Sequence, residues 1–138
     1  MFPVSLLTIR LAAAACALTA QLVHLWVLPG EFITWPLRGT FFLIVAMVQG
    51  ALAVSLALGP GRLTLWLGAL FNALVVAVWL FTRAVGVPTM VVFIREPFGW
   101  PDAIATAAEL LLITLSVSLL VLRRQGGDVV HRTEPLHA

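Results

Sequence analysis

The chain has 138 residues, of which 62% are hydrophobic and 10% are charged. Soluble domains are roughly half apolar and about a quarter charged, so this composition indicates an integral membrane protein. All 8 basic residues are arginine, and the lack of lysine excludes a Walker-type phosphate loop and a Schiff base. A net charge of only +2 gives no reason to expect nucleic acid, so the expected partner of the arginines is the lipid bilayer, in particular anionic lipid.

Four apolar segments predict an all-α fold with four transmembrane helices, at about residues 4–28, 40–58, 63–82 and 103–122. Each is about 20 residues long, the length that a helix needs to cross about 30 Å of hydrocarbon. Pro and Gly occur in every connection, and the short G59-P-G61 turn predicts that the second and third helices are antiparallel neighbours. Residues 1–122 are therefore expected to form one up-down bundle, and residues 123–138 a polar, disordered tail.

Four spans place both termini on one side of the membrane, and the distribution of arginine indicates which side. On the side of the termini lie Arg10, Arg62, Arg123, Arg124 and Arg132, and on the opposite side lie Arg38, Arg83 and Arg95. Because cytoplasmic segments carry the excess of basic residues, we expect both termini to be cytoplasmic.

A layer of polar residues is predicted in the outer half of the bundle. Counting 1.5 Å per residue from the outer helix ends places His24 about 6 Å deep, Gln21 and Glu109 about 10 Å, Gln49 about 14 Å and Asn72 about 17 Å. Every helix therefore contributes a polar group to this layer, whereas the inner half offers mainly serine and threonine.

Helical spacing adds further residues to this layer. One row in the third helix consists of Asn72, Val76, Trp79 and Arg83, and one in the fourth consists of Asp102, Thr106 and Glu109. Residues three or four apart lie on one helix face, so inward-facing rows predict a small cavity that opens outward. Arg83 and Arg95 are candidate counter-ions for the acidic residues there. The full candidate site is Gln21, His24, Gln49, Asn72, Arg83, Glu96, Asp102 and Glu109.

Each candidate also has a structural interpretation. Gln49 and Asn72 fit interhelical hydrogen bonds that lock a bundle. His24 fits either a structural donor or a ligand or proton-transfer group. An intramembrane carboxylate such as Glu109 is a functional candidate by default, but an ion pair with Arg83 would also account for it.

No cofactor or catalytic site is expected. The chain lacks a paired-histidine pattern for haem, a Ser/His/Asp set and a dinucleotide glycine motif. His24 is only a weak metal candidate, because it is a lone histidine. The alternative that remains is an accessory subunit of a membrane redox enzyme. The apolar outer run T89-M-V-V-F-I94 is expected to fold over the outer mouth of the bundle or to pack against a neighbouring subunit.

Four segments carry a resemblance: F41-F-L-I-V-A-M-V-Q49, G68-A-L-F-N72, W79-L-F-T-R-A-V-G-V-P88, and E96-P-F-G-W-P-D102 followed by A-T-A-A-E109. They resemble small four-helix integral membrane proteins of actinobacteria and related high-GC bacteria. The resemblance covers the second to fourth helices and implies the same topology in a bacterial plasma membrane. It also implies that Gln49, Asn72, Arg83, Glu96, Asp102 and Glu109 act as a set, without implying an activity.

Two functions follow as hypotheses. The first is a non-catalytic accessory or structural subunit of a larger membrane complex, or a homo-oligomeric bundle, suggested by the small size and the apolar outer loop. The alternative is binding or conduction of a cation, proton or small polar solute at the outer polar layer around Glu109, because carboxylate, amide and imidazole groups at one depth suit such a site.

Overall fold

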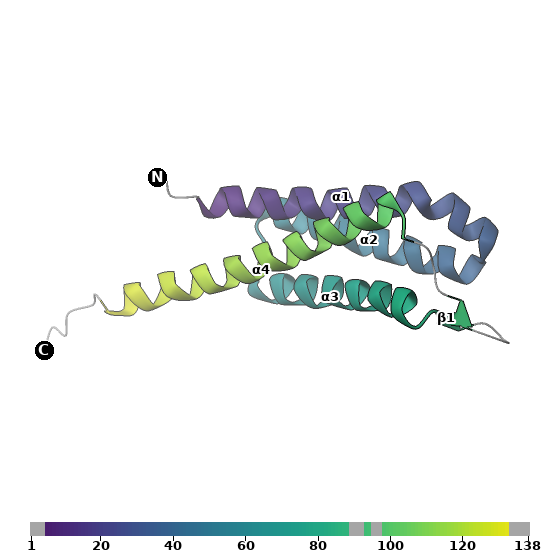
Figure 1. The fold of residues 1–138 in the computed structure, drawn as a ribbon. Coiled ribbons are helices and arrows are strands. Elements are labelled where there is room, and N and C mark those ends of the chain that lie inside the picture. The colour runs from purple at the N-terminus through teal and green to yellow at the C-terminus, as the bar shows by residue number, and fades with distance from the viewer. Residues whose placement is uncertain (1–4, 89–92, 95–97, 133–138) are drawn as a thin grey trace, which may run out of the picture.

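Four helices account for most of the chain, and the computed structural model describes residues 5–88, 93–94 and 98–132 (Figure 1). The helices are α1 (Leu6–Thr34), α2 (Pro36–Leu58), α3 (Arg62–Ala84) and α4 (Trp100–Arg132). Between α3 and α4, strands β1 (Val87–Pro88) and β2 (Phe93–Ile94) pair antiparallel. All 4 helices are long and apolar enough to cross a membrane, which confirms the prediction of four such helices.

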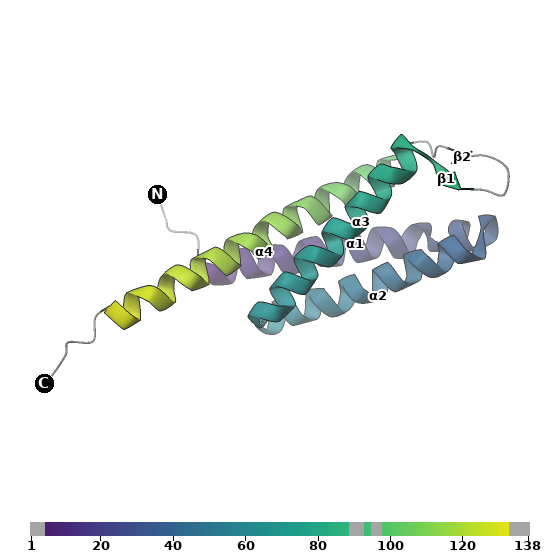
Figure 2. The same cartoon turned by 90° about the horizontal axis from the view of Figure 1, so that it is seen from below.

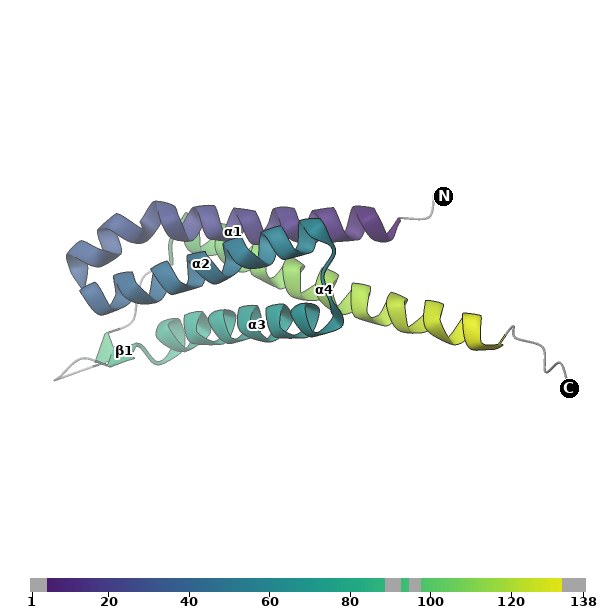
Figure 3. The same ribbon diagram turned by 180° about the vertical axis from the view of Figure 1, so that it is seen from behind.

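The two ends of the helix bundle differ in their connections (Figures 1 and 3). The turn between α2 and α3 lies toward the end at which α1 begins, and α4 runs past this turn to its own last residue. The junction between α1 and α2 and the β1–β2 hairpin lie at the opposite end. We call these the Gly59 end and the hairpin end.

The junction between α1 and α2 is one residue long, which corrects the expected helix bounds of 4–28 and 40–58. α1 continues through Pro29, and only Trp35 leaves the helical conformation, with φ −159° and ψ 108°. A residue before proline is pushed into this extended region, and Pro36 can then start α2 because the first amide of a helix needs no partner. An ion pair of 2.7 Å between Glu31 and Arg38 links the two helices across the junction.

The predicted turn between α2 and α3 is present. α2 ends at Leu58 and is capped by Gly59, whose φ of 113° lies in the left-handed region that glycine adopts without a steric penalty. Its amide donates to the Ser55 carbonyl at 3.1 Å, which satisfies one of the last carbonyls of the helix.

The fourth helix is longer than expected. It begins at Trp100 instead of residue 103, and it continues beyond Leu122 to Arg132. α4 thus extends into the expected polar tail as far as Arg132, whereas residues 133–138 lie outside the described part of the chain. Arginine and glutamine are good helix formers, and they extend the turn that follows Leu122.

The packing order also differs from the expected one. α1 lies against α2 and α4, and α4 lies against α1 and α3, whereas α2 and α3 touch each other little. α2 and α3 approach closely at Gly68, where an added Cβ would lie 2.8 Å from Cδ1 of Leu52. Toward the hairpin end they diverge (Figure 2). They are consecutive and antiparallel but splayed, and Phe42 and Val78 line a pocket in the widening gap.

Small side chains explain how α1 packs closely against α2 and α4. Ala13, Ala17 and Ala20 recur at helical spacing, and each is completely buried. A face of alanine lets neighbouring helices approach closely, which is how helices in lipid gain packing energy without a hydrophobic driving force.

The half of the bundle toward the Gly59 end is closed by leucine. Leu56, Leu65, Leu112 and Leu119 are fully buried, and Leu52 is nearly so. Together they belong to one apolar cluster, which we call the leucine layer. Large apolar side chains are exposed on the outer faces of all four helices, as expected of surfaces that contact lipid.

Ser116 is the exception in this apolar half. Its Oγ is buried and has no hydrogen-bond partner in the described part of the chain. We expect Ser116→Ala to leave the free energy of unfolding unchanged or to raise it by up to about 1 kcal/mol, because it removes an unsatisfied polar atom. Unfolding in mixed micelles would measure this.

Ser118→Ala is the matched control. The Ser118 hydroxyl donates to the Thr114 carbonyl at 2.8 Å, so its removal deletes a hydrogen bond. A larger loss of stability for Ser116→Ala than for Ser118→Ala would show that Ser116 has a partner in the membrane.

Candidate functional site

Four buried polar side chains, one from each helix, form a hydrogen-bonded network. The exposed fractions are 5% for His24, 0% for Gln49, 0% for Asn72 and 2% for Glu109. Gln49 is the hub, because its Nε2 donates to Asn72 Oδ1 at 3.2 Å and to Glu109 Oε1 at 2.8 Å. Its Oε1 lies 2.9 Å from Nδ1 of His24. We call these four residues the polar network, and the structure thus brings together four of the five residues that the sequence places in one polar layer.

The direction of each hydrogen bond follows from a backbone contact. Asn72 Nδ2 donates to the Gly68 carbonyl at 2.8 Å, so Asn72 presents its oxygen to Gln49. Gln49 must then turn its amide nitrogen toward Asn72 and Glu109, which leaves its oxygen facing His24. Nδ1 of His24 therefore lies between two acceptors, this oxygen and the Ala20 carbonyl at 2.8 Å, so Nδ1 carries a proton.

The network ends at two groups that both accept hydrogen bonds. With a proton on Nδ1, neutral His24 has its lone pair on Nε2, which lies 3.9 Å from Glu109 Oε1. This distance is too long for a direct hydrogen bond. Within the described residues, Glu109 Oε2 makes no hydrogen bond either. One small donor at about 2.8 Å from each atom would bridge the pair.

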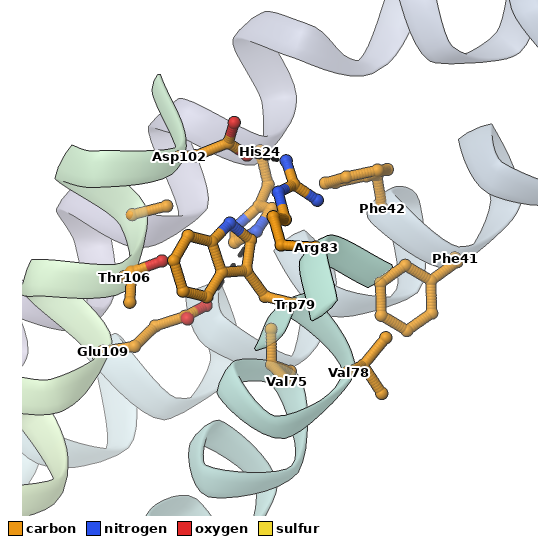
Figure 4. Close-up of a pocket in the computed structure, with 11 residues that line it drawn as sticks. His24, Phe41, Phe42, Val75, Val78, Trp79, Arg83, Asp102, Thr106 and Glu109 are labelled. Carbon is orange, nitrogen blue, oxygen red and sulfur yellow. Dashed lines mark ion pairs between the residues drawn. The ribbon is translucent and has the colours of Figure 1, made fainter. Parts of the chain in front are cut away.

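These acceptors line a pocket near the hairpin end (Figure 4). Its cavity volume is about 50 Å³, and it opens to the surroundings. The apolar walls are Phe41 and Phe42 of α2 and Val75, Val78 and Trp79 of α3. Asp102, Ala105 and Thr106 of α4 complete the lining, with Arg83 at the end of α3. The row Asp102, Thr106 and Glu109 therefore faces the pocket.

An ion pair lies at the rim of the pocket. Arg83 Nη2 and Asp102 Oδ1 are 2.8 Å apart, and both side chains are partly exposed. Asp102 Oδ2 also accepts from the Gly99 amide at 2.9 Å, which positions it at the start of α4. The Arg83 guanidinium lies 5.5 Å from the centre of the Trp79 ring. The interpretation of Glu109 as the ion-pair partner of Arg83 is thus corrected: Arg83 pairs with Asp102, and Glu109 contacts Gln49 and His24.

Other candidates lie elsewhere. Gln21 does not join the polar network; its side chain fills the space beside Gly50 of α2 that a Cβ would need. Arg95 and Glu96 lie outside the described residues. The same holds for residues 89–92 of the apolar outer run, so its expected fold over the bundle has no structural description.

Trp79 belongs to a row that the sequence predicts to face inward, but Phe41 and Phe42 were absent from the sequence-based site. Phe42 packs against His24, with ring centres 5.5 Å apart. Its position seven residues before Gln49 is two helical turns along the same face, so helical spacing could have identified it. Phe41 shows no such signal, because two adjacent residues on a helix do not share a face.

The described side chains include no group of three His, Cys, Asp or Glu residues placed to hold a metal ion. The polar network contains one imidazole and one carboxylate, which is too few ligands for a tetrahedral zinc site without further donors.

The fold and the buried polar network define the class of the chain, a multi-pass helical membrane protein with a polar site between its helices. No protein-family model, curated protein or solved structure matches it. Its function must therefore be argued from the site itself.

Proposed function

We propose that the protein binds a proton or a small cation of the ammonium type in the pocket, with Glu109 as the principal acceptor. The observation that supports this most directly is the pair of facing acceptors, His24 Nε2 and Glu109 Oε1, which lie 3.9 Å apart in the lining of the pocket. A proton on either atom, or a donor-bearing cation between them, would complete the network. An isolated carboxylate in the membrane is costly, so a positive partner is favoured.

The charges around Glu109 support a positive ligand. The charged and titratable side chains that line the pocket with it are His24 from α1, Arg83 from α3 and Asp102 from α4, and α2 contributes none. Arg83 and Asp102 neutralise each other at the rim. With His24 neutral, Glu109 is the one unbalanced charge among the described side chains that line the pocket. Aromatic faces such as those of Trp79 and Phe42 attract cations by their ring quadrupoles.

Binding is favoured over conduction, because a route through the bundle is closed. The leucine layer lies between the polar network and the Gly59 end, and four of its members are completely buried. Access is then from the hairpin end alone. With the arginine distribution, we place the hairpin end outside a bacterial plasma membrane and both termini in the cytoplasm, in an up-down bundle.

The proposal predicts the effect of Glu109→Gln, which keeps an oxygen for Gln49 but removes the charge. Calorimetric titration of the purified protein with methylammonium chloride, at an ionic strength fixed with sodium chloride, should show saturable binding. The substitution should weaken it by about tenfold or more, because a charge-assisted hydrogen bond is lost. Infrared spectra should show one carboxylic-acid band that titrates with pH and is absent in Glu109→Gln.

Glu31→Gln is the matched control, since Glu31 is paired with Arg38 at the same end of the molecule, outside the pocket lining. It should bind methylammonium like the wild type. The proposal fails if the wild type shows neither saturable binding nor a titrating band assignable to Glu109.

The second candidate is a non-catalytic accessory subunit of a larger membrane complex, or a homo-oligomer. The splay between α2 and α3 favours it, because Phe41 is exposed at this seam and available to a neighbouring subunit. Gentle solubilisation from native membranes would test it. A stoichiometric set of co-purifying subunits supports this candidate, and a strict monomer without partners contradicts it.

A further inference from the structure

Two arginines from different helices converge on the turn between α2 and α3, at the end of the molecule opposite the pocket. Arg123 of α4 donates from Nη1 to the Pro60 carbonyl at 2.7 Å. Arg10 of α1 places its Nη1 beside Gly59, 3.4 Å from the position that a Cβ would take. Because Gly59 and Pro60 are consecutive, both guanidinium groups lie at the same turn.

Arg10 is only partly exposed, yet it makes no hydrogen bond or ion pair in the described part of the chain. Its Nε is buried without a partner. A guanidinium group carries five N–H donors and remains charged, so such a side chain requires an external acceptor. Arg62, the first residue of α3, and Arg124 add further positive charge beside the turn, and both are exposed.

Nothing described at this end balances the charge. The acidic residues with described side chains, Glu31, Asp102 and Glu109, belong to the hairpin half. The C-terminal end of α2 supplies a dipole equivalent to about half a negative charge, which falls short of two guanidinium groups. Asp128 follows on the extension of α4, where only the backbone is described. The turn is therefore a site of net positive charge.

The surroundings of the turn indicate which kind of anion would suit the arginines. Leu58 is 81% exposed and Leu63 is 70% exposed, so apolar side chains flank the arginines at the level where the helices leave the membrane. We infer that Arg10 and Arg123 bind the phosphate of an anionic phospholipid whose acyl chains cover these leucines. A free phosphate ion would satisfy the guanidinium groups but leave the leucines uncovered.

Lipid-selective stabilisation tests this inference. The purified protein in uncharged detergent is heated with added phosphatidylglycerol, with phosphatidylcholine or with inorganic phosphate, and native mass spectrometry counts retained lipids. We expect phosphatidylglycerol to raise Tm and to be retained about tenfold better than phosphatidylcholine, as charge-assisted hydrogen bonds would give. Arg10→Gln should remove this preference. Arg10→Lys keeps the charge but loses the planar guanidinium group that can donate two hydrogen bonds to one phosphate, so it should retain only part of the preference for phosphatidylglycerol.

Arg38→Gln is the control, because it removes one positive charge at the hairpin end and should keep the preference for phosphatidylglycerol. The inference is overturned if both lipids stabilise the wild type equally, if Arg10→Gln retains the preference, or if inorganic phosphate raises Tm as much as phosphatidylglycerol. Since none of these readings depends on Glu109, the result is separate from the test of the pocket.

Discussion

Gln49→Met is expected to lower the free energy of unfolding by about 2 kcal/mol. Methionine has nearly the volume of glutamine, but it cannot replace the hydrogen bonds that tie α2 to α1, α3 and α4. Interhelical hydrogen bonds in membranes average about 0.6 kcal/mol each, and the loss of three accounts for this estimate. Reversible unfolding in mixed micelles, followed by tryptophan fluorescence, would measure it.

Gln21→Met serves as the matched control. Gln21 is also a glutamine within an apolar helix, but it lies beside Gly50 and outside the polar network. We expect it to change stability by well under 1 kcal/mol. Equal losses for the two substitutions would mean that the network contributes nothing beyond ordinary packing.

The polar network shows how much of the site could be predicted from helical spacing and from the depth of each residue in the membrane. Rise per residue placed His24, Gln49, Asn72 and Glu109 at similar depths, and in the structure they lie in contact. The depth of a residue in the membrane does not determine toward which side of its helix the side chain points. Gln21 was placed in the same layer by its depth of about 10 Å, yet its side chain lies beside Gly50.

The sequence could not show which carboxylate pairs with Arg83, for a similar reason. Arg83, Asp102 and Glu109 all belong to inward rows, and either carboxylate could have met the arginine. The structure pairs Arg83 with Asp102 near the rim, where both remain partly hydrated, and leaves Glu109 deeper with Gln49. A partly exposed pair avoids most of the desolvation cost that a buried pair must offset.

The length of the apolar segments was enough to predict that the four helices exist, but it did not predict the residues at which they end. Pro29 was expected to end α1, but the helix continues to Thr34 and the chain turns at Trp35. Proline breaks a helix less often in a membrane, because freed backbone groups find other partners there. The divergence of α2 and α3 toward the hairpin end could not be predicted either (Figure 2). The short turn between them only requires the two helices to lie side by side at the Gly59 end.

The leucine layer should be the other major source of stability. Leu112 is fully buried one turn below Glu109 and separates it from Ser116 on the same face of α4. Leu112→Ala should lower the free energy of unfolding by about 2 kcal/mol, at the low end for leucine truncations. The reason is that unfolded membrane helices remain in lipid, so the packing contribution is lost but the transfer contribution is not.

Leu111→Ala provides the comparison, because Leu111 is the adjacent residue and is 51% exposed. We expect it to lower the free energy of unfolding by less than about 0.5 kcal/mol, since this side chain contacts lipid in both the folded and the unfolded state. Methylammonium binding should persist in Leu112→Ala, because the contacts of Glu109 with Gln49 and His24 do not involve the leucine. Equal losses of stability for Leu112→Ala and Leu111→Ala would show that this half of the bundle is loosely packed. The leucine layer would then no longer support access to the pocket from the hairpin end alone.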